Sequence, residues 1–99
     1  MQAVSTPPTR EAILADVVGI VGEMMQDWDH RFGGEINEDT LLLAGLGFQS
    51  IDVVMLAGEL HRLYRRKVPF ERLLLANGRP VEDVRVGALV DFLVEQLRA

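Results

Sequence analysis

The chain has 99 residues, no cysteine and a formal net charge of −5, and its length suits one domain with a modest core. The acidic charge argues against non-specific nucleic-acid binding, which needs many phosphate-neutralising cations, and suits enzymes with basic docking surfaces. Without cysteine there is no disulfide, no thiolate nucleophile and no thiolate metal ligand.

The chain opens with a stretch rich in serine, threonine and proline, residues 1–9, which we expect to form a loose arm. From Arg10 to about Trp28, the apolar spacing predicts a helix with one wide apolar face. Either Thr9 or Thr6 is the candidate N-cap. The expected core positions of this helix are Ile13, Val17, Ile20, Val21, Met24 and Trp28.

No targeting segment is recognisable in this region. The start lacks a basic leader, and Asp16 and Glu23 interrupt the following apolar stretch, so it fits neither a signal peptide nor a membrane span. The expected location is therefore the cytoplasm.

A long connection follows the first helix, from Gly33-Gly34 to Gly47. Because it contains Ile36 and the apolar run 41–43, we expect those residues to be buried and the connection to pack over the helices. Long ordered loops are often functional. The acidic run 37–40 lacks the alternating oxygen ligands and closing glutamate of a calcium loop, so we predict no metal site.

The second helix is predicted from Ser50 to about Arg66, with Pro69 ending it, since the residue before a proline leaves the helical region. Its expected apolar positions are Ile51, Val54, Leu56, Leu60, Leu63 and Tyr64.

The rest of the chain predicts a short helix and a final one. Residues 70–76 suit one or two helical turns, and residues 77–80 have the composition of a turn. The last helix is expected over about 86–97, with Asp83 as its candidate cap. Its apolar stripe is Val86, Leu89, Val90, Leu93 and Leu97. No segment alternates with period two, so we predict an all-α bundle of three main helices plus a short one.

The heptad Leu46-Gly47-Phe48-Gln49-Ser50-Ile51-Asp52 is the candidate functional motif. It places a glycine and then a serine at the first turn of the second helix. A helix N-terminus has unpaired N–H groups and partial positive charge, which would stabilise a phosphate on Ser50. A serine here can also simply start a helix, so the motif gains weight only from the rest of the chain.

The order of elements and three short sequences resemble the acyl carrier protein family over roughly residues 11–98. The sequences are Ile36-Asn37-Glu38-Asp39-Thr40-Leu41, the heptad itself, and Val68-Pro69-Phe70. The family typically reads Leu-Gly-x-Asp-Ser-Leu at its attachment site. Leu46, Gly47 and Ser50 match it, Ile51 replaces the leucine conservatively, and Asp52 matches the acid that often follows.

The resemblance implies an acyl-carrier fold over residues 10–99 with a long loop between helices 1 and 2. It also implies that Ser50 bears 4′-phosphopantetheine, attached covalently from coenzyme A by a phosphopantetheinyl transferase. The prosthetic thiol would hold acyl thioesters of a fatty-acid, polyketide or related biosynthetic pathway, in a chain that has no cysteine of its own. Gly47, Gln49, Ile51 and Asp52 would flank the cofactor.

The expected protein is a free-standing, monomeric carrier that performs no catalysis itself. Its partners would be enzymes that load or use acyl groups: a ketosynthase, an acyltransferase or an acyl ligase. The alternatives are an aminoacyl or peptidyl carrier, and an unmodified helical interaction module of the same fold. An enzyme is not indicated, because neither His30 nor His61 lies in a catalytic or metal-binding spacing.

Two features depart from the family pattern. Gln49 replaces an aspartate that caps the helix and contacts the transferase in the family, and glutamine is a weak cap. The serine helix, strongly acidic in fatty-acid carriers, here has Asp52 and Glu59 but also Met55, Gly58, His61 and Arg62, followed by the basic run 65–67. The expected docking residues are Asp52, Met55, Glu59 and Arg62. The basic run suits either a helix C-terminus or a dedicated set of partner enzymes.

Overall fold

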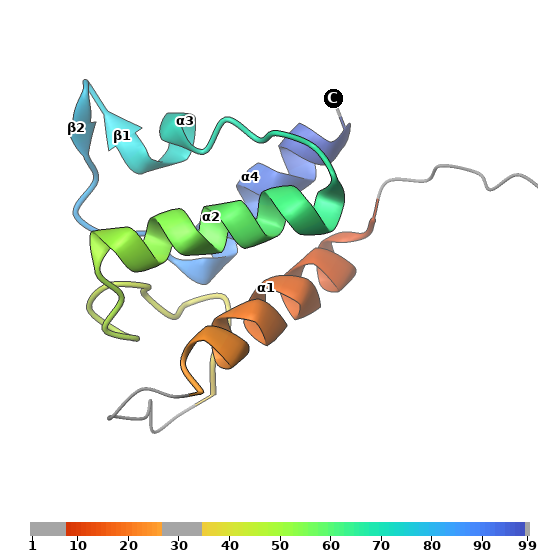
Figure 1. The fold of residues 1–99 in the computed structure, drawn as a ribbon, viewed down its shortest axis with the longest axis horizontal. Coiled ribbons are helices and arrows are strands. Elements are labelled where there is room, and N and C mark those ends of the chain that lie inside the picture. The colour runs from red at the N-terminus through yellow and green to blue at the C-terminus, as the bar shows by residue number, and fades with distance from the viewer. Residues whose placement is uncertain (1–7, 27–34, 99) are drawn as a thin grey trace, which may run out of the picture.

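The computed structural model describes residues 8–26 and 35–98. This part of the chain contains four helices and one hairpin (Figure 1). In chain order they are α1 (Arg10–Met24), α2 (Ser50–Tyr64), α3 (Glu71–Leu74), β1 (Leu75–Ala76), β2 (Arg79–Pro80) and α4 (Val86–Arg98). The prediction of a mostly helical bundle with one short helix is confirmed at this level. The hairpin was not predicted.

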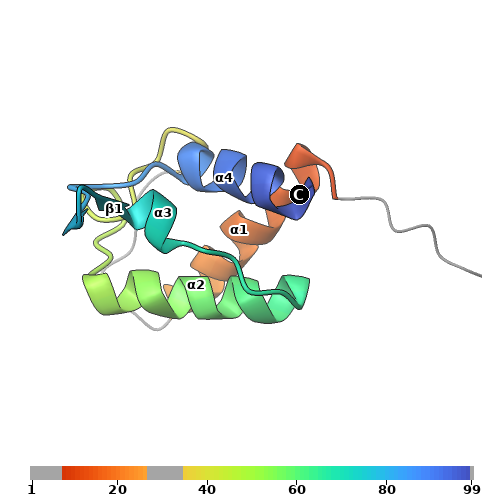
Figure 2. The ribbon, with the colours of Figure 1, turned by 90° about the horizontal axis from the view of Figure 1, so that it is seen from above.

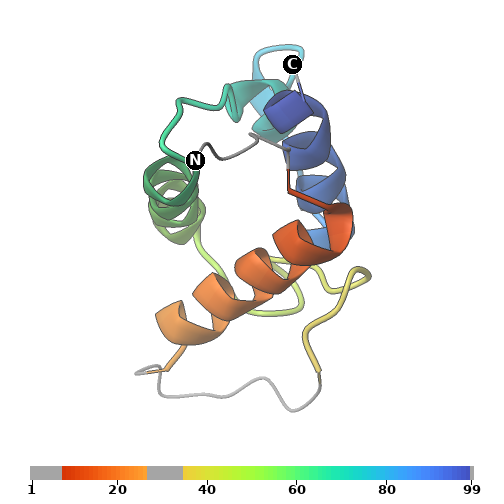
Figure 3. The same cartoon turned by 90° about the vertical axis from the view of Figure 1, so that its right-hand side faces the viewer.

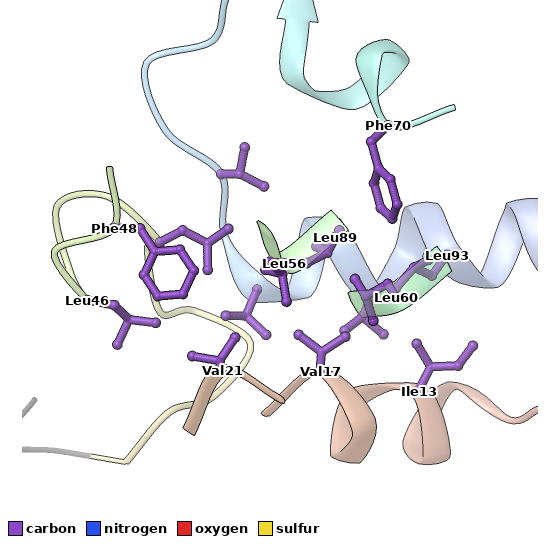
Figure 4. Close-up of a cluster of buried hydrophobic side chains, with 14 of the residues drawn as sticks. Ile13, Val17, Val21, Leu46, Phe48, Leu56, Leu60, Phe70, Leu89 and Leu93 are labelled. Carbon is purple, nitrogen blue, oxygen red and sulfur yellow. The ribbon is translucent and has the colours of Figure 1, made fainter. Parts of the chain in front are cut away.

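The three long helices surround one core. Viewed along the bundle, α2 and α4 lie on opposite sides, α1 crosses beneath them and α3 lies between them at the top (Figure 2 and Figure 3). α1 packs principally against α4. Side chains from each long helix and from the loop before α2 meet at the centre (Figure 4). The fully buried ones are Ile13, Val17, Val21, Leu42, Leu46, Leu56, Leu60, Val86, Val90 and Leu93.

Helix α1 begins where the sequence predicts and ends earlier. The Thr9 hydroxyl accepts a hydrogen bond from the Ala12 N–H at 3.1 Å, which confirms Thr9 as the N-cap. The helix ends at Met24 rather than near Trp28. Trp28, the glycine pair 33–34, His30 and the arm residues 1–7, including Thr6, lie outside the described residues.

Helix α2 ends at Tyr64, before the predicted Arg66, and Pro69 is not the cause. Arg65 adopts a left-handed conformation with φ 56°, and the Arg66 N–H turns back to the His61 carbonyl at 3.2 Å. This is the common left-handed way in which a helix terminates, made here without the usual glycine.

The predicted apolar face of α2 is only half right. Leu56 and Leu60 are buried, and Tyr64 is partly buried, with its hydroxyl donating to Asp16 of α1 at 2.9 Å. In contrast, Ile51, Val54 and Leu63 are 61%, 63% and 47% exposed. The apolar positions of the sequence therefore do not form one buried face, because α2 turns only a narrow stripe toward the core.

The segment predicted as a turn is the tip of a hairpin. Leu75 pairs with Pro80 and Ala76 with Arg79 in antiparallel register. Asn77 and Gly78 form the two-residue connection, with φ of 54° and 77°. Positive φ at both positions is what a tight hairpin turn needs, and asparagine followed by glycine tolerates it best. Two-residue strands give no alternation, which explains why the pattern missed them.

The long loop over 35–49 packs against the bundle, as predicted. Leu42 is buried and both Ile36 and Leu43 pack on the core, whereas Leu41, expected to be buried, is 37% exposed. Leu41 instead forms an antiparallel bridge with Arg85. The start of α4 is closed by this loop, since Thr40 and Glu38 carbonyls accept from the N–H groups of residues 86 and 87 at 2.9 and 2.8 Å.

Asp83 does not cap α4, so that prediction is wrong. Its carboxylate accepts hydrogen bonds from the backbone N–H groups of Leu43, Ala44 and Val84 at 2.9, 2.9 and 2.8 Å. Because the loop carbonyls already satisfy the first amides of α4, the Asp83 side chain is available to hold the loop.

Candidate functional site

The loop before Ser50 contains a tight turn, and the residues on both sides of this turn are buried. Leu46 and Phe48 are buried, with 1% and 4% of their surface exposed, and Gly47 between them is exposed with φ 80°. The N–H groups of residues 46, 47 and 48 return to the carbonyls of residues 41, 43 and 42. Gly47 is therefore required for its backbone conformation.

Asp83 fixes the other side of this loop. Partial burial by itself raises the pKa of the Asp83 carboxyl, but hydrogen bonds from the amides of Leu43, Ala44 and Val84 outweigh it. The pKa therefore lies below its ordinary value, and the carboxylate is ionised at neutral pH. A side chain 40 positions away in sequence thus holds the turn that precedes the candidate serine.

The N-terminus of α2 is capped from inside the helix. Gln49 is the N-cap residue, and its backbone N–H donates to the Asp52 carboxylate at 2.8 Å. This is the half of a capping box that an acid at the third helical position supplies. Asp52 therefore has a structural role at the site and takes over part of the capping that Gln49 was expected to lack.

Ser50 is the first residue of α2 and is exposed. Its hydroxyl makes no hydrogen bond within the described chain, and neither do the backbone N–H groups of Ser50 and Ile51. The side chain is thus accessible, and two unpaired amides at a partly positive helix end would favour a phosphate attached to it.

An apolar groove of about 360 Å³ opens beside Ser50. Helix α2 forms one side of it through Val53 and Ala57, and α3 with the hairpin forms the other. Apart from Ser50, Glu71 is the one polar residue of its lining; the apolar ones are Leu43, Val53, Val54, Ala57, Phe70, Leu74, Leu75, Pro80, Val81 and Val84. The volume lies within the ordinary range of small-molecule sites.

The floor of this groove is the core itself. A slot of about 10 Å³ lies beneath it among the core side chains and shares Val53, Ala57 and Leu74 with the groove. A space of that size is at the lower limit for a single water, and its apolar lining side chains offer a water no hydrogen-bond partner. A guest in the groove would therefore contact dry hydrocarbon.

Of the other residues expected to flank the cofactor, Ile51 follows Ser50 directly and is more than half exposed. Val54, which was not in the expected set, lies three positions further along α2 and is also more than half exposed. Exposed apolar side chains in such a group are typical of surfaces that meet another protein.

The expected docking residues divide between two roles. Met55 is 55% exposed, Glu59 is partly buried and Arg62 is exposed, and all three lie on the side of α2 that faces α1. Arg62 donates to Glu59 at 3.3 Å. Asp52, as a cap, is engaged with the backbone.

His61 is not part of an exposed docking face. It is partly buried, its Nε2 lies 2.9 Å from the Val68 carbonyl oxygen, and its ring is 5.2 Å from the Phe70 ring. The basic run 65–67 is exposed and follows the end of α2. Only this run and Arg62 remain as accessible cations on or next to the helix.

Sequence reasoning missed two parts of the site, Asp83 as a loop anchor and the hairpin as a groove wall. The pair Asn77-Gly78 was the available signal for a hairpin. Nothing local distinguishes an aspartate that caps the next helix from one that binds an earlier loop.

Comparisons of the chain with protein-family models, with curated proteins and with solved structures found no match. Among the described residues, no helix is long and apolar enough to cross a membrane. In the same part of the chain, no group of three or more His, Cys, Asp or Glu side chains could hold a metal ion.

Proposed function

We propose that the protein is an acyl carrier, in which Ser50 bears 4′-phosphopantetheine and the attached thiol carries an acyl group between enzymes in the cytoplasm. The observation that carries the proposal is an exposed serine at the N-terminus of α2 opening onto an apolar groove. The motif around the serine resembles the carrier attachment site, and the helix end favours the phosphate. The protein itself performs no catalysis.

Each residue near the serine has a defined part in this proposal. Gly47 and the buried Phe48 place the start of α2, and Asp52 closes its first turn. Ser50 would supply the nucleophilic hydroxyl toward the β-phosphorus of coenzyme A in the transferase; the pyrophosphate bond would break and the serine proton would pass to a base of that enzyme. The products are the phosphodiester-linked arm and adenosine 3′,5′-bisphosphate.

The groove favours an acyl over an aminoacyl cargo. Burying an aliphatic chain contributes about 0.8 kcal/mol for each CH₂ group. An ammonium group placed there would lose its hydration, and Glu71 at the lining is the one acid available to it. Loading enzymes would accordingly be an acyltransferase, a ketosynthase or an acyl ligase.

Intact mass spectrometry tests the attachment directly. The purified protein is incubated with coenzyme A and a broad-specificity phosphopantetheinyl transferase. We expect one phosphopantetheine adduct on the wild type and none on Ser50→Ala, while Ser5→Ala, in the N-terminal arm, still takes up one. An unmodified wild type would favour the helical interaction module, for which the exposed Ile51 and Val54 would be the contact residues.

Thermal stability of loaded forms tests the cargo. Acyl groups of increasing length, from acetyl to octanoyl, are attached, and the unfolding midpoint is measured. A chain that enters the groove raises the midpoint with each added CH₂ pair. Ala57→Leu, which narrows the groove, should remove this dependence without blocking attachment at Ser50. A midpoint independent of chain length would mean that the groove does not hold the cargo.

A further inference from the structure

A second groove lies on the opposite side of α2, between α2 and α1. It has a volume of about 430 Å³ and is continuous with a hollow of about 220 Å³, because Ile20, Glu23 and Glu59 line both. It does not include Ser50 or any residue of the apolar groove beside it. Figure 3 shows the two helices that border this groove, α1 in orange and α2 in green.

This second groove is open to solvent, and its lining combines apolar and charged side chains. Ile20 and Met24 come from α1, and Met55 and Leu63 from α2; the last two are 55% and 47% exposed. Flexible methionine side chains suit a surface that adapts to a bound apolar face. Because α1 packs principally on α4, its contact with α2 leaves this channel unfilled.

Gly19 lines this groove, and no contact within the described chain requires a glycine at that position. A Cβ built there meets no atom within 4 Å, and the residue has no positive φ. Glycine within a helix costs about 1 kcal/mol relative to alanine. Gly22 is equally unconstrained, but only Gly19 lines the groove, where the absent side chain leaves room for an occupant.

The border of the channel is acidic. Asp16, Glu23 and Glu59 line it, against the single cation Arg62, which is already 3.3 Å from Glu59. Asp16 accepts from the Tyr64 hydroxyl but keeps further acceptor capacity. An occupant with Lys or Arg on both sides of an apolar stripe would complement this border.

We propose that the α1–α2 groove binds a short cationic amphipathic helix of a partner protein. From Ala15 to Met24, α1 advances about 14 Å, so the groove accommodates two to three helical turns. Apolar side chains of the partner rest on Ile20, Met55 and Leu63, and its cations face the acidic border. Since Ser50 is on the other side of α2, the partner holds the protein while the serine stays accessible.

The test uses a synthetic helix as the probe. A roughly 15-residue Leu/Ala/Lys peptide with a single apolar stripe is titrated into the ¹⁵N-labelled protein, beside a Leu/Ala/Glu peptide of the same pattern. We expect the Lys peptide to shift the amide signals of Gly19, Ile20 and Met55, with an affinity that falls as salt is added. The Glu peptide should bind at least about tenfold more weakly.

Two glycines provide a matched pair of variants. Gly19→Leu fills the groove and should weaken binding at least about tenfold. Gly22→Leu, an equally open position of α1 outside the groove lining, should leave binding unchanged. Both substitutions replace an exposed helical glycine and should not destabilise α1. Glu23→Lys should weaken binding through charge alone.

Binding should also persist in Ser50→Ala, so the inference stands or falls independently of the proposed carrier function. Equal binding of the Lys peptide by Gly19→Leu and Gly22→Leu would overturn it. So would equal binding of the two peptides, or a dissociation constant weaker than about 1 mM. Self-association detected by sedimentation, and lost in Gly19→Leu, would assign the groove to a second copy of this chain and would likewise overturn it.

Discussion

Removing the Asp83 carboxylate should loosen the loop that places the candidate serine. Asp83→Ala deletes the common acceptor of three backbone N–H groups, those of Leu43, Ala44 and Val84. Taken at about 1 kcal/mol each, these bonds would total about 3 kcal/mol. Asp83 is partly exposed, and water can replace it at the exposed Ala44, so we expect a loss of about 2 kcal/mol.

For a domain of this size, about 2 kcal/mol lowers the unfolding midpoint by about 8–16 °C. Circular dichroism during heating and in urea measures the loss. Asp39→Ala is the matched control, because that carboxylate is 91% exposed and its ion pair with Arg85 is long at 3.7 Å. It should cost less than about 0.5 kcal/mol. Amide hydrogen exchange should accelerate at Leu43 and Ala44 in the Asp83 variant alone.

The same contact has a predictable pH dependence. The folded-state pKa of Asp83 lies below the ordinary value of 3.8. Its contribution is therefore present in full above that value and is lost as pH falls through the folded-state pKa. The stability difference between wild type and Asp83→Ala should be constant near neutral pH and should shrink in strong acid.

Two outcomes would refute this account of the loop. One is a stability loss for Asp83→Ala no larger than for Asp39→Ala. The other is unchanged exchange at Leu43 and Ala44 despite a loss of stability, because Asp83 would then stabilise the chain through something other than the loop.

Three further variants test the site and its surroundings. Gln49→Asp should stabilise α2 by about 0.5–1 kcal/mol, a gain that repulsion between the new carboxylate and Asp52 reduces. It should also speed modification of Ser50 by a general transferase. An unchanged urea midpoint and an unchanged modification rate would contradict this prediction. Gly47→Ala should cost about 1–2 kcal/mol because φ is 80°, and should slow modification of Ser50 measured by mass; wild-type values would mean that the turn relaxes freely. Replacing Arg62 and Arg65 with Glu should improve loading by a generic fatty-acid transferase and impair exchange with the native partner. If the wild type is already loaded as fast as a fatty-acid carrier, these cations are only solvated charges at the end of the helix.

The sequence alone predicted the helices and their starts. Thr9 caps α1 and Ser50 begins α2, as expected, since a cap and an apolar period are properties of a few adjacent residues. Helix ends were predicted less well. α2 ends at Tyr64 because Arg65 turns left-handed, and arginine has no side-chain preference for that conformation, so no local signal marked the position.

The candidate serine and its glycine could also be predicted from the sequence, because the motif lies in one short segment. The groove beside them was not, since its walls come from the loop, α2, α3 and the hairpin. The apolar pattern of α2 could not show which side chains face solvent. Ile51 and Leu56 both belong to an apolar helix, yet one is 61% and the other 2% exposed.

Only the tertiary structure decided what the polar side chains contact. Asp83 reads as a cap for the helix that follows it, but it binds amides 39 and 40 positions earlier. The reason is that loop carbonyls already accept hydrogen bonds from the first amides of α4, so the Asp83 carboxylate accepts from the loop amides instead. No local sequence pattern indicates this exchange of partners. Local periodicity determines which elements form, whereas satisfaction of backbone groups across the fold determines how they are joined.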